Sequence, residues 1–181
     1  LLEKLVHKES HLSVVEHCSY SFSIKGLPRY VLQELARHRI ASYSVKSTRY
    51  TLKELANEEP FIQEDSENPG GLIYSYKEAF KYIEPSNDST MHYKQIWQLE
   101  QLRDAVESKK YSLDDVKYLV PESYLTNLVW TINVRSLRNF LHLRLSKSAH
   151  FKIRELAELV YDAIPQEHKF LFEDLRKEGN A

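Results

Sequence analysis

The segment 90–108 constrains the fold most, because it carries the longest run of apolar residues at helical spacing. The stripe is formed by Met91, Ile96, Trp97, Leu99, Leu102 and Val106. Apolar residues that recur every three or four positions predict an amphipathic helix with one face on a core. The same spacing predicts helices over 134–145 and 149–164, and a last helix that carries Phe170, Leu171 and Leu175. A chain with this many helical stripes must bury them against one another or against a sheet.

Two stretches follow the period of a strand instead. In 18–25, Tyr20, Phe22 and Ile24 alternate with serines, which is typical of a half-buried strand. Residues 124–132 are rich in residues that favour strands. The expected fold is therefore α+β, a helix-rich single domain with a small antiparallel sheet.

Local signals mark some helix ends. Pro28 suits the start of a helix that runs up to Arg37, and Leu52 and Leu55 indicate a short helix further on. Ser112 followed by Asp115 is a capping box for a helix through Val120. These signals place the polar clusters described below at helix ends.

Composition limits the class of protein. The 181 residues are 42% hydrophobic, which fits one domain over 1–181 with a proper core. The net charge of −1 argues against a general binder of nucleic acid or membrane surface. Cys18 is the only cysteine, so no intrachain disulfide is possible, and a cytoplasmic location is expected. No apolar run approaches the roughly 20 residues that span a bilayer. Because the chain begins at Leu1, we expect an N-terminal segment to be missing.

Residues 57–71 differ from their surroundings. They hold five acidic residues, no basic residue, two prolines and the pair Gly70-Gly71. We interpret the segment as an acidic mobile loop or lid. A disordered insertion without function is an equally open interpretation.

The densest group of hydrogen-bond donors is Arg37-His38-Arg39, followed after seven residues by Ser47 and then Arg49. An arginine fork stays charged and donates two parallel hydrogen bonds, which suits phosphate. The alternative is that the cations only complement the negative end of a helix. Ser47 and Arg49 favour an anionic ligand, because they add donors near the same corner.

A second donor-rich stretch is 133–144, where Asn133 directly precedes a predicted helix that carries Arg135, Arg138, Asn139 and Arg144. An enclosed arginine needs an anionic partner. A solvated helix face remains the alternative. A third cluster, with His11, Ser13, Glu16 and His17, lacks the spacing of a zinc site, so no metal is expected.

Three segments together resemble the flavin-dependent thymidylate synthase family. They are HLSVVEH at 11–17, RHRIASYSVKSTRY at 37–50 and NVRSLRNFLHLR at 133–144. The resemblance implies a methyltransferase of dTMP biosynthesis that methylates deoxyuridine monophosphate (dUMP) reductively. Methylenetetrahydrofolate would supply the carbon, and FAD reduced by NADPH would supply the hydride. It also implies a homotetramer with active sites shared between subunits.

The resemblance also assigns residues. It implies contacts to the flavin cofactor from Ser13, Arg37, His38, Arg39, Asn133, Arg135 and Asn139. It implies contacts to the nucleotide from Arg37, Ser47, Thr48, Arg49, Lys117 and Arg144. Arg144 is the expected catalytic residue, since a guanidinium beside the uracil would stabilise negative charge that develops there.

Four positions depart from the family pattern. Ser44-Val45 replaces an Asn-Glu pair, Glu34 stands where a Gln often helps to hold the nucleotide, Lys117 replaces an Arg, and Ser148 replaces a His of some members. They motivate an alternative function, a catalytically altered homologue that still binds flavin or nucleotide. An RNA-binding helical module is a third hypothesis, disfavoured by the net charge.

Overall fold

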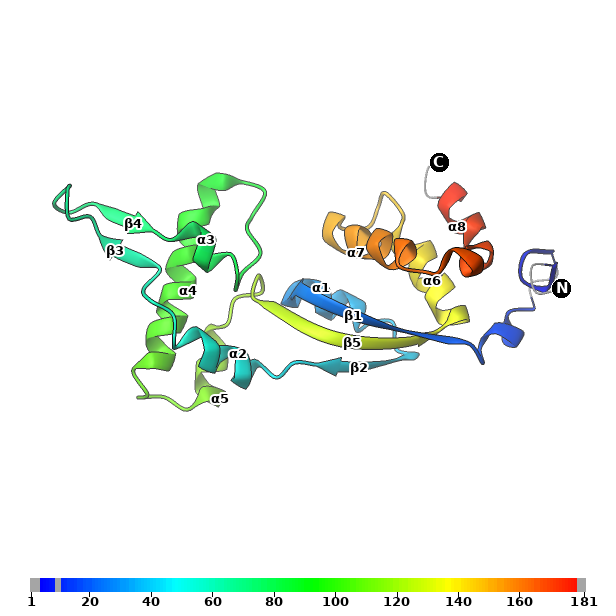
Figure 1. Ribbon diagram of the computed structural model, residues 1–181, viewed down its shortest axis with the longest axis horizontal. Coiled ribbons are helices and arrows are strands. Elements are labelled where there is room, and N and C mark those ends of the chain that lie inside the picture. The colour runs from blue at the N-terminus through cyan, green and yellow to red at the C-terminus, as the bar shows by residue number, and fades with distance from the viewer. Residues whose placement is uncertain (1–3, 9–10, 179–181) are drawn as a thin grey trace. The chain divides into compact units, whose positions relative to one another are not determined.

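The computed structural model describes residues 4–8 and 11–178. It is helix-rich with a small sheet, which confirms the predicted α+β class (Figure 1). The central sheet has three strands in the order β1 (Ser19–Pro28), β5 (Leu125–Asn133) and β2 (Ala41–Val45). Every second side chain of β5 is buried, from Thr126 to Ile132. One face of the sheet therefore packs on a core. In β1, Tyr20, Phe22 and Ile24 are each less exposed than the serines between them, as the alternating pattern predicted.

Contacts between Cα atoms divide the chain into two compact units. The first comprises the described residues of Leu1–Ile24, Val31–Ser44 and Val129–Ala181, and the second comprises Lys25–Tyr30 and Val45–Leu128. The single domain over 1–181 stays a prediction.

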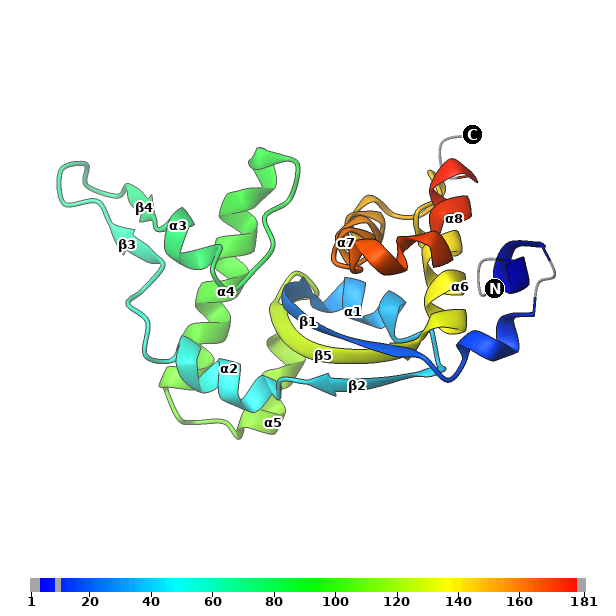
Figure 2. The same cartoon turned by 45° about the vertical axis from the view of Figure 1, so that its right-hand side comes forward.

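Helices cover one face of the sheet in the first unit. They are α1 (Arg29–Leu35), most of which lies in this unit, α6 (Val134–Arg144) and α7 (Phe151–Asp162). Figure 2 shows α6 and α7 side by side above the strands. Two 3-10 segments, Leu12–Val15 and Gln166–Leu171, a π-helical turn at Lys4–Lys8 and helix α8 (Glu173–Glu178) complete the unit. Trp130 and Phe140 are fully buried between sheet and helices, with ring centroids 5.0 Å apart.

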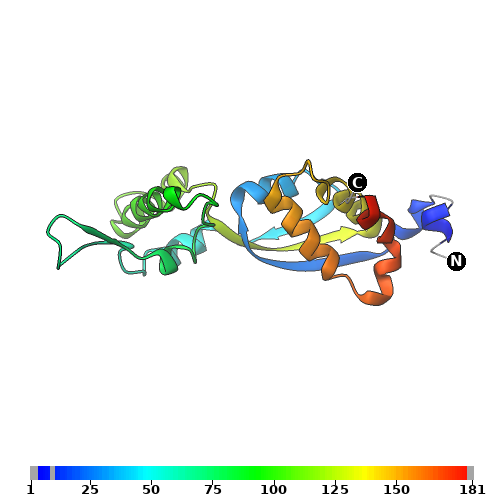
Figure 3. The same cartoon turned by 90° about the horizontal axis from the view of Figure 1, so that it is seen from above.

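The second unit is built around α4 (His92–Glu107), the helix predicted over 90–108 (Figure 3). The neighbouring elements are α2 (Thr48–Leu55), α3 (Tyr76–Ala79), α5 (Leu113–Val116) and 3-10 turns at Ser89–Met91 and Lys117–Leu119. Ile96, Leu99 and Leu102 are fully buried in its core. The capping box is confirmed, since Ser112 Oγ accepts from the Asp115 backbone N–H at 3.1 Å.

The acidic segment 57–71 holds part of an antiparallel hairpin. β3 (Ile62–Glu64) pairs with β4 (Leu72–Tyr74) in the register Ile62 to Tyr74 and Glu64 to Leu72. The start of the hairpin is anchored where Glu100, 7% exposed, accepts from the Phe61 backbone N–H at 2.6 Å. The segment is thus partly ordered by backbone pairing, and its mobility stays a prediction.

Several predicted core positions were wrong. Met91 is 41% and Trp97 52% exposed, although the helical spacing of 90–108 placed them on its apolar stripe. Leu159, an apolar residue at helical spacing in the helix predicted over 149–164, is 62% exposed. These residues lie at the edges of their apolar stripes. The face of each helix that packs against other elements is narrower than its apolar stripe. Both ends of the helix expected from Pro28 to Arg37 also differ. Pro28 is the last residue of β1, and α1 ends at Leu35. In the described ranges, no helix has the length and apolar character to cross a membrane.

Candidate functional site

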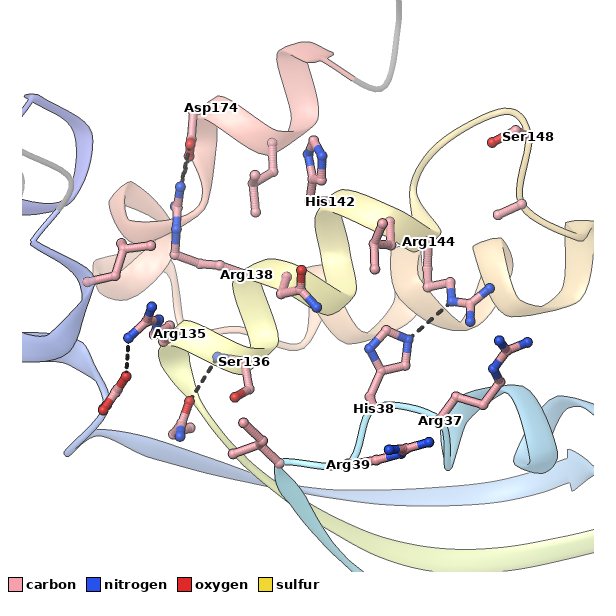
Figure 4. A pocket seen from close by; sticks show the side chains of 18 residues that line it. Arg37, His38, Arg39, Arg135, Ser136, Arg138, His142, Arg144, Ser148 and Asp174 are labelled. Carbon is pink, nitrogen blue, oxygen red and sulfur yellow. Dashed lines mark hydrogen bonds and ion pairs between the residues drawn. The ribbon is translucent and has the colours of Figure 1, made fainter.

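A cavity of about 1380 Å³ opens in the first unit. The residues that line it come from the turn after α1, from α6 and the loop that follows it, and from segments before β1 and in α8 (Figure 4). Its polar lining consists of Glu16, Arg37, His38, Arg39, Asn133, Arg135, Ser136, Arg138, Asn139, His142, Arg144, Ser148 and Asp174. The two donor-rich stretches that were separate in the sequence therefore meet around one cavity.

Tyr43 holds the corner after α1 in place. Its hydroxyl lies 2.9 Å from the Leu35 carbonyl oxygen and 2.6 Å from that of His38, and it can donate to either. The His38 ring packs edge-on against Phe140 at 5.0 Å. This corner holds His38 at the cavity, between the exposed side chains of Arg37 and Arg39.

His38 also contacts the guanidinium of Arg144. Arg144 Nε donates to His38 Nε2 at 3.2 Å, and Arg144 Nη1 donates to Glu34 Oε2 at 3.2 Å. Burial, and then the charges of Arg144 and Arg37, lower the pKa of His38. A neutral imidazole follows, with Nε2 as the acceptor.

The N-terminus of α6 is capped by a predicted site residue. The Asn133 side-chain oxygen accepts from the Ser136 backbone N–H at 2.8 Å. Two residues further on, Arg135 forms an exposed ion pair with Glu16. Asn139 lines the same cavity. The Asn133 amide group keeps its two donors, because the cap uses only the oxygen.

Arg138 belongs to the cavity wall but was not predicted as a site residue. It pairs with Asp174 at 2.9 and 2.5 Å and donates to the Leu171 carbonyl, and its side chain is 11% exposed. Burial raises the pKa of Asp174, but the Arg138 hydrogen bond and charge outweigh it, so the net pKa is lowered. Arg138 was visible as a cation in the second stretch, whereas nothing in the sequence pointed to Asp174.

Arg37 and Arg39 differ from the other cavity arginines. In the part of the chain that the structure describes, neither has an acidic partner within ion-pair distance. Both are exposed and both line the cavity. Two cations without a counter-charge make this corner suited to an anionic ligand.

The remaining predicted nucleotide contacts lie in the second unit. Arg49 donates two hydrogen bonds to the Asp114 carboxylate, of 3.3 and 2.5 Å, and Lys117 Nζ lies 2.6 Å from the same carboxylate. The hydrogen bonds from Lys117 and then Arg49 lower the pKa of Asp114. Thr48 accepts from Arg29 at 3.3 Å, and Ser47 precedes α2 as its N-cap without a side-chain capping bond. The consecutive residues Ser47, Thr48 and Arg49 are thus joined by the distant Lys117, through the carboxylate of Asp114.

Ser13 lies in the 3-10 segment Leu12–Val15 and is exposed, while its neighbour Leu12 lines the cavity. Within 4–8 and 11–178, no three His, Cys, Asp or Glu side chains are grouped so that they could hold a metal ion.

A family model described as "thymidylate synthase complementing protein" matches residues 1–168. The chain is 48% identical to a flavin-dependent thymidylate synthase of Campylobacter jejuni over 173 residues, 96% of this chain and 78% of that protein. It is 45% identical to one of Wolinella succinogenes over 179 residues, 99% of this chain and 82% of that protein.

Among solved structures, thymidylate synthase X from Helicobacter pylori, determined with FAD and dUMP, matches with a TM-score of 0.86 and 40% identity. The match covers 96% of this chain and 80% of that one. The fold, the arginine-lined cavity and these similarities define one class, the flavin-dependent nucleotide methylases. In particular, the chain belongs to the flavin-dependent thymidylate synthase family, which confirms the resemblance seen in the sequence.

Proposed function

We propose that this protein methylates dUMP to dTMP, with methylenetetrahydrofolate as carbon donor and NADPH-reduced FAD as hydride carrier. The observation that carries the proposal is the cavity where Arg37 and Arg39 have no acidic partner among the described residues and Arg144 lies close by. Family membership supports it, because the relatives are named flavin-dependent thymidylate synthases and a similar solved structure holds FAD and dUMP.

The cavity suits a dinucleotide cofactor. Its volume of about 1380 Å³ exceeds the roughly 300–1,000 Å³ of most small-molecule sites. Bound flavin would accept a hydride from NADPH and pass it to the substrate carbon. The proposed contacts to FAD are Ser13, Arg37, His38, Arg39, Asn133, Arg135 and Asn139. Guanidinium and amide donors bind and orient a pyrophosphate and a flavin ring, and neutral His38 adds no further positive charge.

The nucleotide is proposed to contact Arg37, Ser47, Thr48, Arg49, Lys117 and Arg144. Arg49 and Lys117 share one carboxylate, so their group keeps a net positive charge that a phosphate can neutralise. Arg144 would lie beside the uracil and stabilise the negative charge that develops there, which makes it the proposed catalytic residue.

The proposal includes a homotetramer whose active sites combine residues of several subunits, with folate as a further ligand. It includes no nucleic acid, membrane or metal partner. The proposed location is the cytoplasm.

Incubation with FAD, NADPH, methylenetetrahydrofolate and dUMP tests the reaction, with dTMP detected by mass. We expect product that disappears when FAD or NADPH is omitted. Flavin binding without product would overturn the proposed activity in favour of a catalytically altered homologue. An Arg37→Ala, Arg39→Ala double variant is expected to lose flavin retention on gel filtration. Lys152→Ala serves as its control, because this cation of α7 in the same unit does not line the cavity.

A further inference from the structure

Glu34 has a position that differs from that of the other acidic residues near the cavity. Glu16 and Asp174 line the cavity itself, whereas Glu34 does not. Its carboxylate instead contacts Arg144, which does line the cavity. The side chains of Glu34 and Arg144 are 31% and 19% exposed. Glu34 therefore reaches the cavity only through the guanidinium that it holds.

The same guanidinium joins two elements. Glu34 is in α1, His38 follows that helix, and Arg144 is the last residue of α6. Arg144 uses Nη1 toward Glu34 and Nε toward His38, so both contacts constrain one rigid plane (Figure 4 shows the contact to His38). A planar guanidinium fixed at two edges has little freedom to rotate.

Charge gives Glu34 a further effect. Arg37, Arg39 and Arg144 all line this end of the cavity, and like charges disfavour a close approach. Without a counter-charge, Arg144 would gain by turning away into solvent. An anionic partner is the arrangement that keeps a mostly enclosed guanidinium in place.

We propose that Glu34 is a positioning residue that holds Arg144 against His38, and thereby fixes His38 with Nε2 as a hydrogen-bond acceptor. The consequence of this positioning for catalysis rests on the proposed function, since Arg144 is the residue assigned to the uracil. The positioning itself involves only side chains of this chain and needs no ligand.

The His38 tautomer tests the structural part without a substrate. Nitrogen chemical shifts from ¹⁵N-labelled protein at pH 8 separate the two neutral forms, and His38→Gln assigns the signal among the eight histidines. We expect the Nδ1–H form in the unmodified protein. Glu34→Ala and Arg144→Ala should both shift His38 toward the Nε2–H form, because the donor to Nε2 is lost. Glu34→Gln should keep the original form, because the amide oxygen still accepts from Arg144.

If Glu34→Ala leaves the His38 tautomer unchanged while Arg144→Ala alters it, the positioning role of Glu34 is refuted. Glu155→Ala is the matched control, since it removes a carboxylate of α7 that is 54% exposed and pairs with Lys152. This control should leave the His38 signal in place. Circular dichroism of each variant distinguishes a local change from loss of the fold.

A double-mutant cycle tests the consequence for ligand binding. The affinity of FAD-loaded protein for dUMP would be measured by calorimetry for the unmodified protein, Glu34→Ala, Arg144→Ala and the double variant. Loss of a charge-assisted hydrogen bond corresponds to about tenfold in affinity, which is the effect expected of Glu34→Ala. In an Arg144→Ala background the same change should have less than about a twofold effect, because coupling acts through Arg144.

An equal effect in both backgrounds would mean that Glu34 acts directly on the nucleotide, which would overturn the proposal. If the unmodified protein fails to bind dUMP, the proposed function fails, while the tautomer experiment still decides the role of Glu34. The two failures are thus distinguishable.

Discussion

The arginines around the cavity differ in their hydrogen-bond and ion-pair partners within the chain. Arg138 is tied to a carboxylate and a backbone carbonyl, and this makes it part of the structure. Arg144 has one carboxylate and one imidazole, so it is held in place while still lining the cavity. Arg37 and Arg39 have no ion-pair partner within the ranges 4–8 and 11–178. The sequence predicted arginines as ligand contacts by type and spacing, but not these differences, because the partners are 33 to 110 residues away.

The substitution Arg144→Ala is expected to lower turnover about 100-fold, which is typical for loss of one preorganised donor to a developing negative charge. The fold should survive, since Arg144 is the last residue of α6 and the core residues of that helix stay in place. Rates of dTMP formation with saturating substrates, together with circular dichroism, check this. Full activity in the variant would contradict the assignment.

Asn133 has two roles that substitutions can separate. Asn133→Ala should lower the free energy of unfolding by about 1 kcal/mol, because α6 loses its N-cap. Asn133→Asp keeps the capping oxygen and should retain stability, but it replaces the amide donors and should weaken flavin binding. Urea unfolding and flavin titration of both variants measure the two effects. Equal stability of Asn133→Ala and the unmodified protein would refute the capping role.

At the scale of elements, local signals were the most predictive. The helix over 134–145 corresponds to α6, and the capping box before α5 forms as expected, because both depend on neighbours within a few residues. The hairpin of β3 and β4, of which only β3 lies within 57–71, was not predicted, since strands of three residues each are too short to show an alternating pattern. The attachment of α8 to α6 by Arg138 and Asp174 joins residues 36 positions apart and has no local signal.

The α6–α8 attachment should depend on pH. Because the folded-state pKa of Asp174 is lowered, its contribution to stability is present above the ordinary carboxyl pKa and is lost as the pH falls through the lower folded value. Asp174→Asn should therefore cost about 1 kcal/mol at pH 7 and much less at pH 3. A hydrogen bond to a charged group is worth about 1.5–3 kcal/mol, and the partial exposure of Asp174 reduces this value. Thermal unfolding at both pH values measures the difference.

Glu173→Gln is the matched control, because this exposed neighbour on α8 has no comparable partner among the described residues. A stability gap for Asp174→Asn that is as large at pH 3 as at pH 7 would show that packing, not the ion pair, carries the attachment.

At the scale of the whole molecule, each compact unit has its own core, and several large apolar side chains remain outside both cores. Tyr118 is 91%, Leu159 62% and Trp97 52% exposed. Exposed apolar surface of this kind is often covered in an assembly. Composition predicted that a core would form. It carries no information on how core residues divide between the two units, because that division depends on which contacts form between distant segments.

The proposed homotetramer predicts a mass in solution of four times the 21.4 kDa of one chain. Sedimentation equilibrium in the presence of FAD measures this mass. If active sites are shared between subunits, the specific rate of dTMP formation should fall when the protein is diluted below the concentration at which tetramers dissociate. A single-chain mass with full activity would contradict both expectations.

The aromatic contacts beneath the cavity have an optical consequence. His38 packs on Phe140, and Phe140 packs on Trp130, each with ring centroids 5.0 Å apart. The indole of the first unit is thus two rings from the cavity wall, and the second tryptophan, Trp97, belongs to the other unit. In a Trp97→Phe background, the emission of Trp130 would report directly on flavin through energy transfer. The protein therefore contains its own fluorescent indicator of cofactor loading, and no attached dye is needed.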